Sequence, residues 1–232
     1  MILSTKAIVF NSIKYGDKSL ISKLYTEDRG LISIISPLKK GKKENLRSYF
    51  QPLNCIKVTY YAKSSGTIKR LKEVSHEQSV RKESVEKIIQ KNAIKFFIAE
   101  VLLATIKEEE ENKALFNLLW KNSEALNVAD YVSNFHIYFL NEYIHLLGIQ
   151  PNTETEGSYF DYQEAQFVVN KPRHEQYETQ DLKSIINKVN LGKLDNRIER
   201  NKLLRFYVKF LNYQTGALTN LKSLDILEEV FA

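Results

Sequence analysis

Apolar and polar residues alternate through the first third of the chain with the period of two that is typical of β-strands. Turn-forming residues such as Gly16 and Gly30 separate the alternating segments, and the short spacing around Gly30 predicts a hairpin. Five short strands favour a small barrel over residues 1–78, and their spacing fits an oligonucleotide-binding barrel and an SH3-like barrel equally well. The segments are 7–13, 20–26, 31–36, 55–61 and a fifth around 67–74.

Near Glu83 the hydrophobic period changes to that of amphipathic helices. Gly216 stands where one helical stretch ends, and Ser223 stands where it could cap the last one. Between residues 151 and 172 the helical pattern lapses, and we predict a two-stranded insertion near 159–170. The result is a mostly helical domain over residues 79–232, with helical patterns at 94–105, 135–147, 182–189, 203–211 and 223–229.

Composition indicates a folded protein of a reducing compartment. Hydrophobic residues make up 43% and aromatic residues 11% of the 232 positions, which excludes intrinsic disorder. Cys55 is the only cysteine, so a disulfide framework and a cysteine-based zinc site are excluded. We find no secretory leader, and the longest apolar stretch contains Lys95 and Glu100. We therefore expect a cytoplasmic protein with no membrane partner.

Charge is divided unevenly along the chain. Residues 1–82 hold seventeen Lys and Arg against six Asp and Glu, whereas residues 83–232 hold seventeen against twenty-two. Such an asymmetry indicates contact with a polyanion through the basic part. Because that part also has the pattern of strands, the basic region is a folded surface rather than a disordered tail.

No catalytic set is evident in the sequence. His136 and His145 fall on opposite faces of one predicted helix, and no pair of histidines has the spacing of a metal site. Ser36 and Lys39 match a Ser-x-x-Lys pattern, but the companion motifs of that enzyme class are missing. Glycine-rich phosphate loops are also missing. We expect no enzyme activity, no cofactor and no bound metal.

The barrel region carries two clusters of cations interleaved with aromatic residues. Cations of this kind release counterions from phosphates and give salt-sensitive binding that is independent of sequence. Tyr60 and Tyr61 are neighbours in a strand, so they point to opposite faces and one of them is available for stacking on an unpaired base. The first cluster is Lys39, Lys40, Lys42, Lys43 and Arg47, and the second is Lys69, Arg70 and Lys72.

A further group of cations lies in the helical part. It could form a second nucleic-acid surface or a socket for an acidic partner peptide. It could equally be the polar face of an ordinary amphipathic helix, with Asp195 and Glu199 forming local ion pairs. The sequence favours none of these readings. The residues are Lys193, Arg197, Arg200, Lys202, Arg205 and Lys209.

Several short segments with family-like sequences extend in order over nearly the whole chain. They are residues 5–10, 15–19, 26–31, 37–43, 139–151 and 222–227. The order and spacing of these segments resemble the RecO family of DNA repair and recombination mediators. The resemblance implies an α+β protein, with a five-stranded oligonucleotide-binding (OB) barrel followed by a mostly helical domain.

The resemblance also implies a function on DNA, and with it association with the nucleoid. RecO-family proteins bind single- and double-stranded DNA and anneal complementary strands. With RecR they load RecA onto strands coated by single-strand-binding protein, whose acidic C-terminal tail they contact. Many members have a four-cysteine zinc site after the segment that matches 139–151, and this chain has no cysteine there. Transferred to this sequence, the DNA-contacting candidates are Arg29, Lys39, Lys40, Lys42, Lys43, Arg47, Lys69, Arg70 and Lys72.

Two other functions fit the same residues. An OB barrel does not identify its polymer, so an RNA-binding module in ribosome or tRNA maturation is the alternative. A third possibility is an interaction adaptor, in which the helical domain is the working part and the basic region is only a surface.

Overall fold

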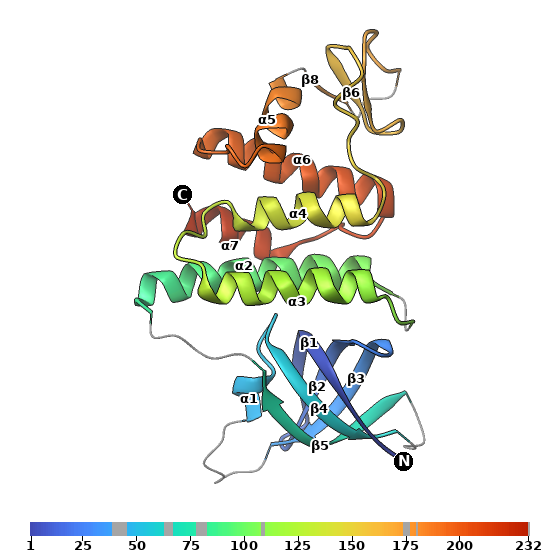
Figure 1. Ribbon diagram of the computed structural model, residues 1–232, viewed down its shortest axis with the longest axis vertical. Coiled ribbons are helices and arrows are strands. Elements are labelled where there is room, and N and C mark those ends of the chain that lie inside the picture. Colours follow the sequence, from blue (N-terminus) through green and yellow to red (C-terminus); the bar gives the residue numbers. More distant parts are fainter. Residues whose placement is uncertain are drawn as a thin grey trace. The chain divides into compact units, whose positions relative to one another are not determined.

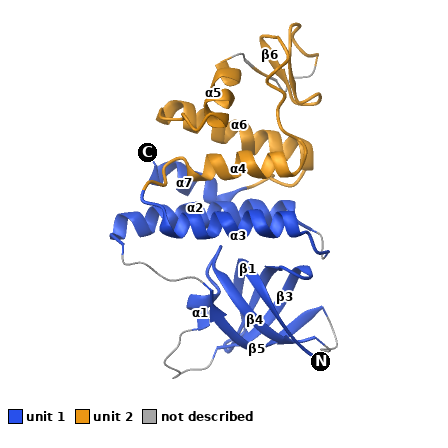
Figure 2. Cartoon of the chain, viewed as in Figure 1, with its two compact units in different colours: residues 1–130, 221–232 blue, residues 131–220 orange. Residues whose placement is uncertain are grey.

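A computed structural model defines two compact units in the chain, residues 1–130 with 221–232 and residues 131–220 (Figure 2). The two units are groups of residues that pack together. The predicted domain boundary after residue 78 is a different division and stays a prediction. Within the described residues no helix is long and apolar enough to cross a membrane. The structure describes residues 1–38, 46–62, 67–77, 83–107, 110–173, 177–179 and 181–231.

Five strands of the first unit form a closed barrel in the order β1-β2-β3-β5-β4 (Figure 1). The β3–β5 pair is parallel and the other pairs are antiparallel. This confirms the predicted five-stranded barrel. The strands are β1 (Ile2–Tyr15), β2 (Ser19–Thr26), β3 (Gly30–Pro37), β4 (Cys55–Tyr61) and β5 (Ile68–His76).

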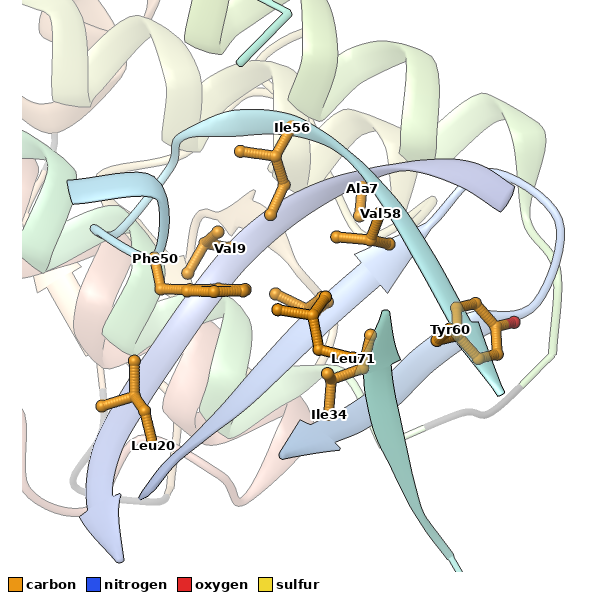
Figure 3. Packing of buried hydrophobic residues seen from close by; sticks show 10 residues of the cluster. Ala7, Val9, Leu20, Ile34, Phe50, Ile56, Val58, Tyr60 and Leu71 are labelled. Atoms are coloured by element: carbon orange, nitrogen blue, oxygen red, sulfur yellow. The ribbon is translucent and has the colours of Figure 1, made fainter. Parts of the chain in front are cut away.

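The barrel interior is filled by inward-facing residues of all five strands, and Phe50 closes one end beside Val9 and Leu20 (Figure 3). Strand β1 has a bulge at Phe10, where the β1–β2 register shifts between Val9 and Asn11, and the bulge allows this long strand to bend. One part of the outer face is covered as well. Ile8 and Tyr25 pair across β1 and β2 outside the barrel core, and both are fully buried.

Helices cover that part of the barrel within the first unit. Helix α2 packs on β1, and Ser123 of α3 donates a buried hydrogen bond to the carbonyl of Leu53, just before β4. The sequence patterns did not predict α1 or α3. The helices are α1 (Leu46–Tyr49), α2 (Val85–Thr105), α3 (Lys113–Val128) and α7 (Lys222–Val230).

Ser223 is not the N-cap of the last helix, so that prediction was wrong. It lies inside α7, and the capping acceptor is the carboxylate of Glu100 on α2. The backbone N–H of Lys222 donates to Glu100 Oε1 (3.1 Å), and the N–H of Ser223 donates to Oε2 (2.8 Å). A carboxylate at a helix N-terminus also interacts favourably with the helix dipole. The cap therefore comes from a residue more than 120 positions away.

The second unit joins three helices to a small antiparallel sheet with the order β7-β6-β8. Two of its strands, β6 and β7, lie within the predicted range 159–170, and β8 adds a third strand beyond that range. Phe160 of β6 makes edge-on contacts with Phe206 and Phe210 of α6, which attaches the sheet to that helix. The elements are α4 (Phe135–Leu146), β6 (Tyr159–Asp161), β7 (Gln166–Val168), β8 (Tyr177–Thr179), α5 (Asp181–Asn190) and α6 (Arg197–Thr215).

Gly30 and Gly16 provide a matched test of how the barrel packs against the chain before α3. Both have positive φ angles, +61° and +57°, so alanine is strained at either position by about 1–2 kcal/mol. A Cβ on Gly30 would lie 2.2 Å from the backbone oxygen of Glu110, whereas one on Gly16 would meet nothing within 4 Å. We expect Gly30→Ala to lower the free energy of unfolding by about 1–3 kcal/mol more than Gly16→Ala. Urea unfolding of both variants measures the difference, and equal losses would contradict the contact.

Candidate nucleic-acid interface

One row of paired residues crosses the outer face of the barrel on its uncovered side. Residues that pair directly across strands project from the same face of a sheet. Arg70 of β5 pairs with Ile35 of β3 and with Tyr61 of β4, and Arg70 and Tyr61 are both exposed. We call this set the outer row. Its members are Ile13, Ile21, Ile35, Arg70, Tyr61 and Ile2.

The outer row combines a cation with apolar and aromatic surface. Tyr61 is 42% exposed, whereas its neighbour Tyr60 is 2% exposed and belongs to the barrel core. This confirms that the two tyrosines point to opposite faces. Burial raises the pKa of the Tyr60 hydroxyl, and the nearby Arg29 opposes that shift. Tyr61 is therefore the ring of this pair that could stack on a base, with the Arg70 guanidinium beside it.

The other predicted contact residues are spread around the barrel. Arg29 is exposed in the β2–β3 turn, where its N–H donates to Thr26 Oγ1 (3.2 Å). Lys72 is exposed at a bulge of β5 next to Glu73, and Lys69 is half-buried. Among the predicted residues that the structure describes, only Arg70 and Lys72 lie on the same stretch of exposed strand. Lys39, Lys40, Lys42 and Lys43 lie outside the described residues.

Arg47 is exposed on the single-turn helix α1, which is held by side chains around it. Asn54 Nδ2 donates to the carbonyl of Ser48 (2.8 Å), and Gln51 Nε2 donates to the carbonyl of Arg47 (2.9 Å). The Tyr49 ring stacks on His76 at the end of β5, with centroids 4.2 Å apart. These contacts fix the backbone of Arg47 against the barrel.

Two cations that the sequence analysis did not single out face each other on the barrel. Lys6 of β1 and Lys57 of β4 are directly paired and both exposed. Lys6 Nζ lies 5.2 Å from the centre of the Trp120 ring on α3. Like charges in a directly opposed pair repel each other, and a bound phosphate would relieve that repulsion. Lys57 lies at an outward position of β4, whose bounds were predicted correctly. The alternation of that strand could therefore have predicted that Lys57 is exposed.

The second basic group is only partly a surface. Arg200 is 7% exposed and lies on the buried side of α6, so it does not take part in a basic surface. Lys193 is exposed before the helix. The other four residues line a hollow of about 630 Å³, together with the apolar side chains of Leu182, Ile198 and Phe206. We call this the α6 hollow; its cations are Arg197, Lys202, Arg205 and Lys209.

Carboxylates neutralise part of the α6 hollow. Lys209 pairs with Glu178 (3.3 Å), and Lys202 pairs with Asp181 (3.4 Å). Glu178 also accepts a hydrogen bond from the Tyr162 hydroxyl (3.1 Å), and burial together with that carboxylate raises the pKa of Tyr162. Glu199 pairs with Lys188 of α5 rather than locally on its own helix. The hollow thus presents positive charge around an apolar floor.

The described residues contain no group of three or more His, Cys, Asp and Glu that could hold a metal ion. Burial lowers the pKa of His136 to about 3, which keeps its imidazole neutral at physiological pH. Cys55 is buried in β4, as its apolar surroundings in the sequence predicted, and burial raises the pKa of its thiol to about 12. A buried, protonated thiol is a poor nucleophile.

Comparison with known proteins identifies the family. The family model described as Recombination protein O N terminal matches residues 1–80, and the one described as Recombination protein O C terminal matches residues 87–225. The chain belongs to the RecO family. The N-terminal match covers the barrel, which is therefore the OB fold of that family. This confirms the resemblance seen in the sequence and the predicted fold class.

Several relatives align with the chain over the full length of both proteins. A protein of Flavobacterium johnsoniae named DNA repair protein RecO is 33% identical over 239 residues, which covers the whole of both chains. Proteins of the same name from Flavobacterium psychrophilum and Phocaeicola vulgatus are 34% and 31% identical, again over the whole of both chains. The chain is thus a protein of DNA repair and recombination.

The burial of Cys55 predicts an unreactive thiol. Because its pKa is raised from 9.0 to about 12, the folded protein holds about a thousandfold less thiolate at a given pH than an unperturbed cysteine. We expect alkylation by iodoacetamide at pH 8 to be slower by at least that factor in the folded protein than in the guanidinium-unfolded chain. Mass spectrometry of timed samples measures both rates. Similar rates would show that the thiol is accessible.

Proposed function

We propose that this protein is a non-enzymatic recombination mediator that binds single- and double-stranded DNA and anneals complementary strands. Acting with RecR, it helps to load RecA onto strands coated by single-strand-binding protein. The observation that carries the DNA-binding part is the outer row, where Arg70 and Tyr61 stand side by side on the uncovered face of an OB barrel. Cations supply affinity for phosphates, and an exposed ring supplies a stacking surface.

The charge distribution supports the same assignment. The basic excess is confined to residues 1–82, which contain the barrel, and the rest of the chain is net acidic. Lys6 and Lys57 add two further cations to the outer face of the barrel. Asp17 neutralises little of the charge of Lys14, since the two form a long, exposed pair at 3.7 Å.

DNA is favoured over RNA because the full-length relatives are named DNA repair proteins. Matched DNA and RNA oligonucleotides in direct competition test this preference, and stronger binding of RNA would favour the alternative function. The adaptor function has a separate test. Residues 1–78 are removed, and strand annealing and partner binding are measured. Loss of annealing with intact partner binding would argue against the adaptor function.

We propose the α6 hollow as the socket for the acidic tail of single-strand-binding protein. Arg197 and Arg205 would pair with carboxylates, and Ile198, which is exposed in the same hollow, would contact an apolar side chain of the same peptide. A phosphate backbone would use the charges but not the apolar floor. The hollow lies in the second unit, so its occupation can be measured independently of the barrel.

The barrel assignment predicts a loss of DNA affinity at defined positions. Replacing Arg70 and Lys72 with alanine removes two exposed cations from β5 without touching the core. We expect weaker binding of single-stranded DNA at low salt, and a slope of log K against log salt that is smaller by about 1 per residue removed. Fluorescence anisotropy over a salt series measures both quantities.

Lys113→Ala combined with Lys121→Ala is the charge-matched control, because both are exposed cations on α3 of the same unit. Its affinity and salt slope should equal those of the wild type. A parallel variant replaces Lys39, Lys40, Lys42 and Lys43 with alanine, and unchanged DNA affinity at low salt would show that this cluster is not part of the site.

The socket predicts loss of peptide binding without loss of DNA binding. Arg197→Ala and Arg205→Ala each remove a cation that lines the α6 hollow. We expect each to weaken binding of a labelled C-terminal peptide of single-strand-binding protein by about two- to fivefold, as for exposed ion pairs. Lys193→Ala, next to α6 but outside the hollow, is the control. Equal weakening by Lys193→Ala would indicate diffuse attraction rather than a socket.

A further inference from the structure

A second hollow lies at one end of the barrel, within the first unit. It has a volume of about 360 Å³, at the low end of the range for small-ligand sites. Strands β1 and β2, the segment that contains α1, and helix α2 all contribute to it. Phe50 and Leu20 form its floor, and both belong to the barrel core. Figure 3 shows the Phe50 ring at this end of the barrel, beside Val9 and Leu20.

The floor of this hollow is rigid. Ser12 Oγ donates to the carbonyl of Phe50 (3.0 Å) and is 2.8 Å from the hydroxyl of Ser22 on β2. These bonds join β1, β2 and the segment after α1. The floor of the hollow is therefore hydrogen-bonded to the closed barrel.

The wall on the α2 side is an exposed aromatic ring. Phe96 lines the hollow and is 53% exposed, whereas the next residue, Phe97, is fully buried in the protein. A large exposed aromatic side chain at the edge of a hollow is a stacking surface for a planar ring. Phe96 makes little contribution to the core, so much of its ring is accessible to a ligand.

Polar groups of the right kind stand at the edge. Asn11 and Gln51 both line the hollow and carry amide side chains. Gln51 donates through Nε2 to the carbonyl of Arg47, and among the described residues no hydrogen bond reaches its Oε1. Amides provide both a donor and an acceptor, which is what the hydrogen-bonding edge of a nucleobase requires. The β1 bulge immediately before Asn11 directs this side chain.

Cations complete the arrangement. Arg47 and Lys14 line the same hollow from α1 and from β1. The charge of Lys14 is only weakly neutralised, because its partner Asp17 is 95% exposed and lies 3.7 Å away. A planar heterocycle with polar edges and an attached phosphate matches this combination of ring, amides and cations, whereas a peptide or an inorganic anion would use only part of it.

We propose that the hollow between β1, α1 and Phe96 is a subsite for a single unpaired base of a bound DNA strand. The inference rests on the proposed DNA-binding function and adds a preference to it. A base must leave its stack to enter the hollow, so the subsite favours single strands over duplexes. Phe96 stacks on the base, Asn11 and Gln51 face its edge, and Arg47 and Lys14 hold the adjoining phosphates.

The test compares Phe96→Ala with the wild type on two probes. One probe is a mixed-sequence single strand of about 16 nucleotides, near the upper end of the length that an OB fold covers. The other has the same number of phosphates but abasic sugars throughout. We expect Phe96→Ala to weaken binding of the normal strand by about 5- to 150-fold and to leave binding of the abasic strand unchanged. The salt slope should not change, because no charge is removed.

Ile89→Ala is the matched control. Ile89 lies on α2 two turns before Phe96 and is 51% exposed. Its replacement by alanine therefore removes a similar exposed apolar group. It should bind both probes like the wild type. Asn11→Ala should lose affinity for the normal strand only, and thermal unfolding checks that each variant is folded.

The outcomes separate this proposal from the proposed function. Salt-dependent binding of DNA by the wild type, with equal affinities for Phe96→Ala on the normal strand, overturns the base subsite and leaves the mediator function standing. Equal losses on both probes also overturn it, since a stacking contact needs a base. Failure of the wild type to bind either probe at low salt overturns the DNA-binding function itself.

Discussion

The closure of the barrel depends on β1 being hydrogen-bonded along both of its edges. Ile8 illustrates this, since it pairs with Tyr25 on β2 and with Cys55 on β4. A flat strand could not reach both neighbours, and the bulge at Phe10 provides the bend. Closure removes the free edges that an open sheet would expose. It also sets the register that places Arg70 beside Tyr61, and it brings β1 to the hollow below Phe96.

Helices cover one face of the barrel, and the other face carries the proposed DNA-binding residues. On the covered side, outward residues such as Ile8 and Tyr25 are buried, and Ser123 donates to the backbone of Leu53. Leu53 has a positive φ of 56°, an unfavourable conformation for a residue with a side chain. Its N–H donates to the carbonyl of Val9 (2.8 Å), so the strained turn is held from both sides. On the uncovered side no comparable packing is required of the outer row, which leaves its residue types available for binding.

The strands of the barrel could be predicted because the alternation of apolar residues indicates strands with one buried face. Strand β4 has the predicted bounds, since its inward positions are all apolar. Other features depend on residues that are distant in sequence. Ser223 was assigned as a cap because a serine suits that position, but Glu100 on another helix provides the acceptor. Arg200 lies on a helix rich in cations, and the pattern of charges did not show that its own side is buried.

The candidate site could be predicted only in its charges. Cations are visible in a sequence, and Arg70 and Lys72 are exposed as expected. The α6 hollow and the hollow beside Phe96 each combine several elements, and no local pattern shows that they meet. This difference has a physical consequence for the proposed annealing function. Phosphate contacts hold any strand and weaken with salt, whereas a base subsite holds only an unpaired nucleotide. A strand held through both would lose the second contact as it pairs with its complement, so pairing itself would promote release of the product.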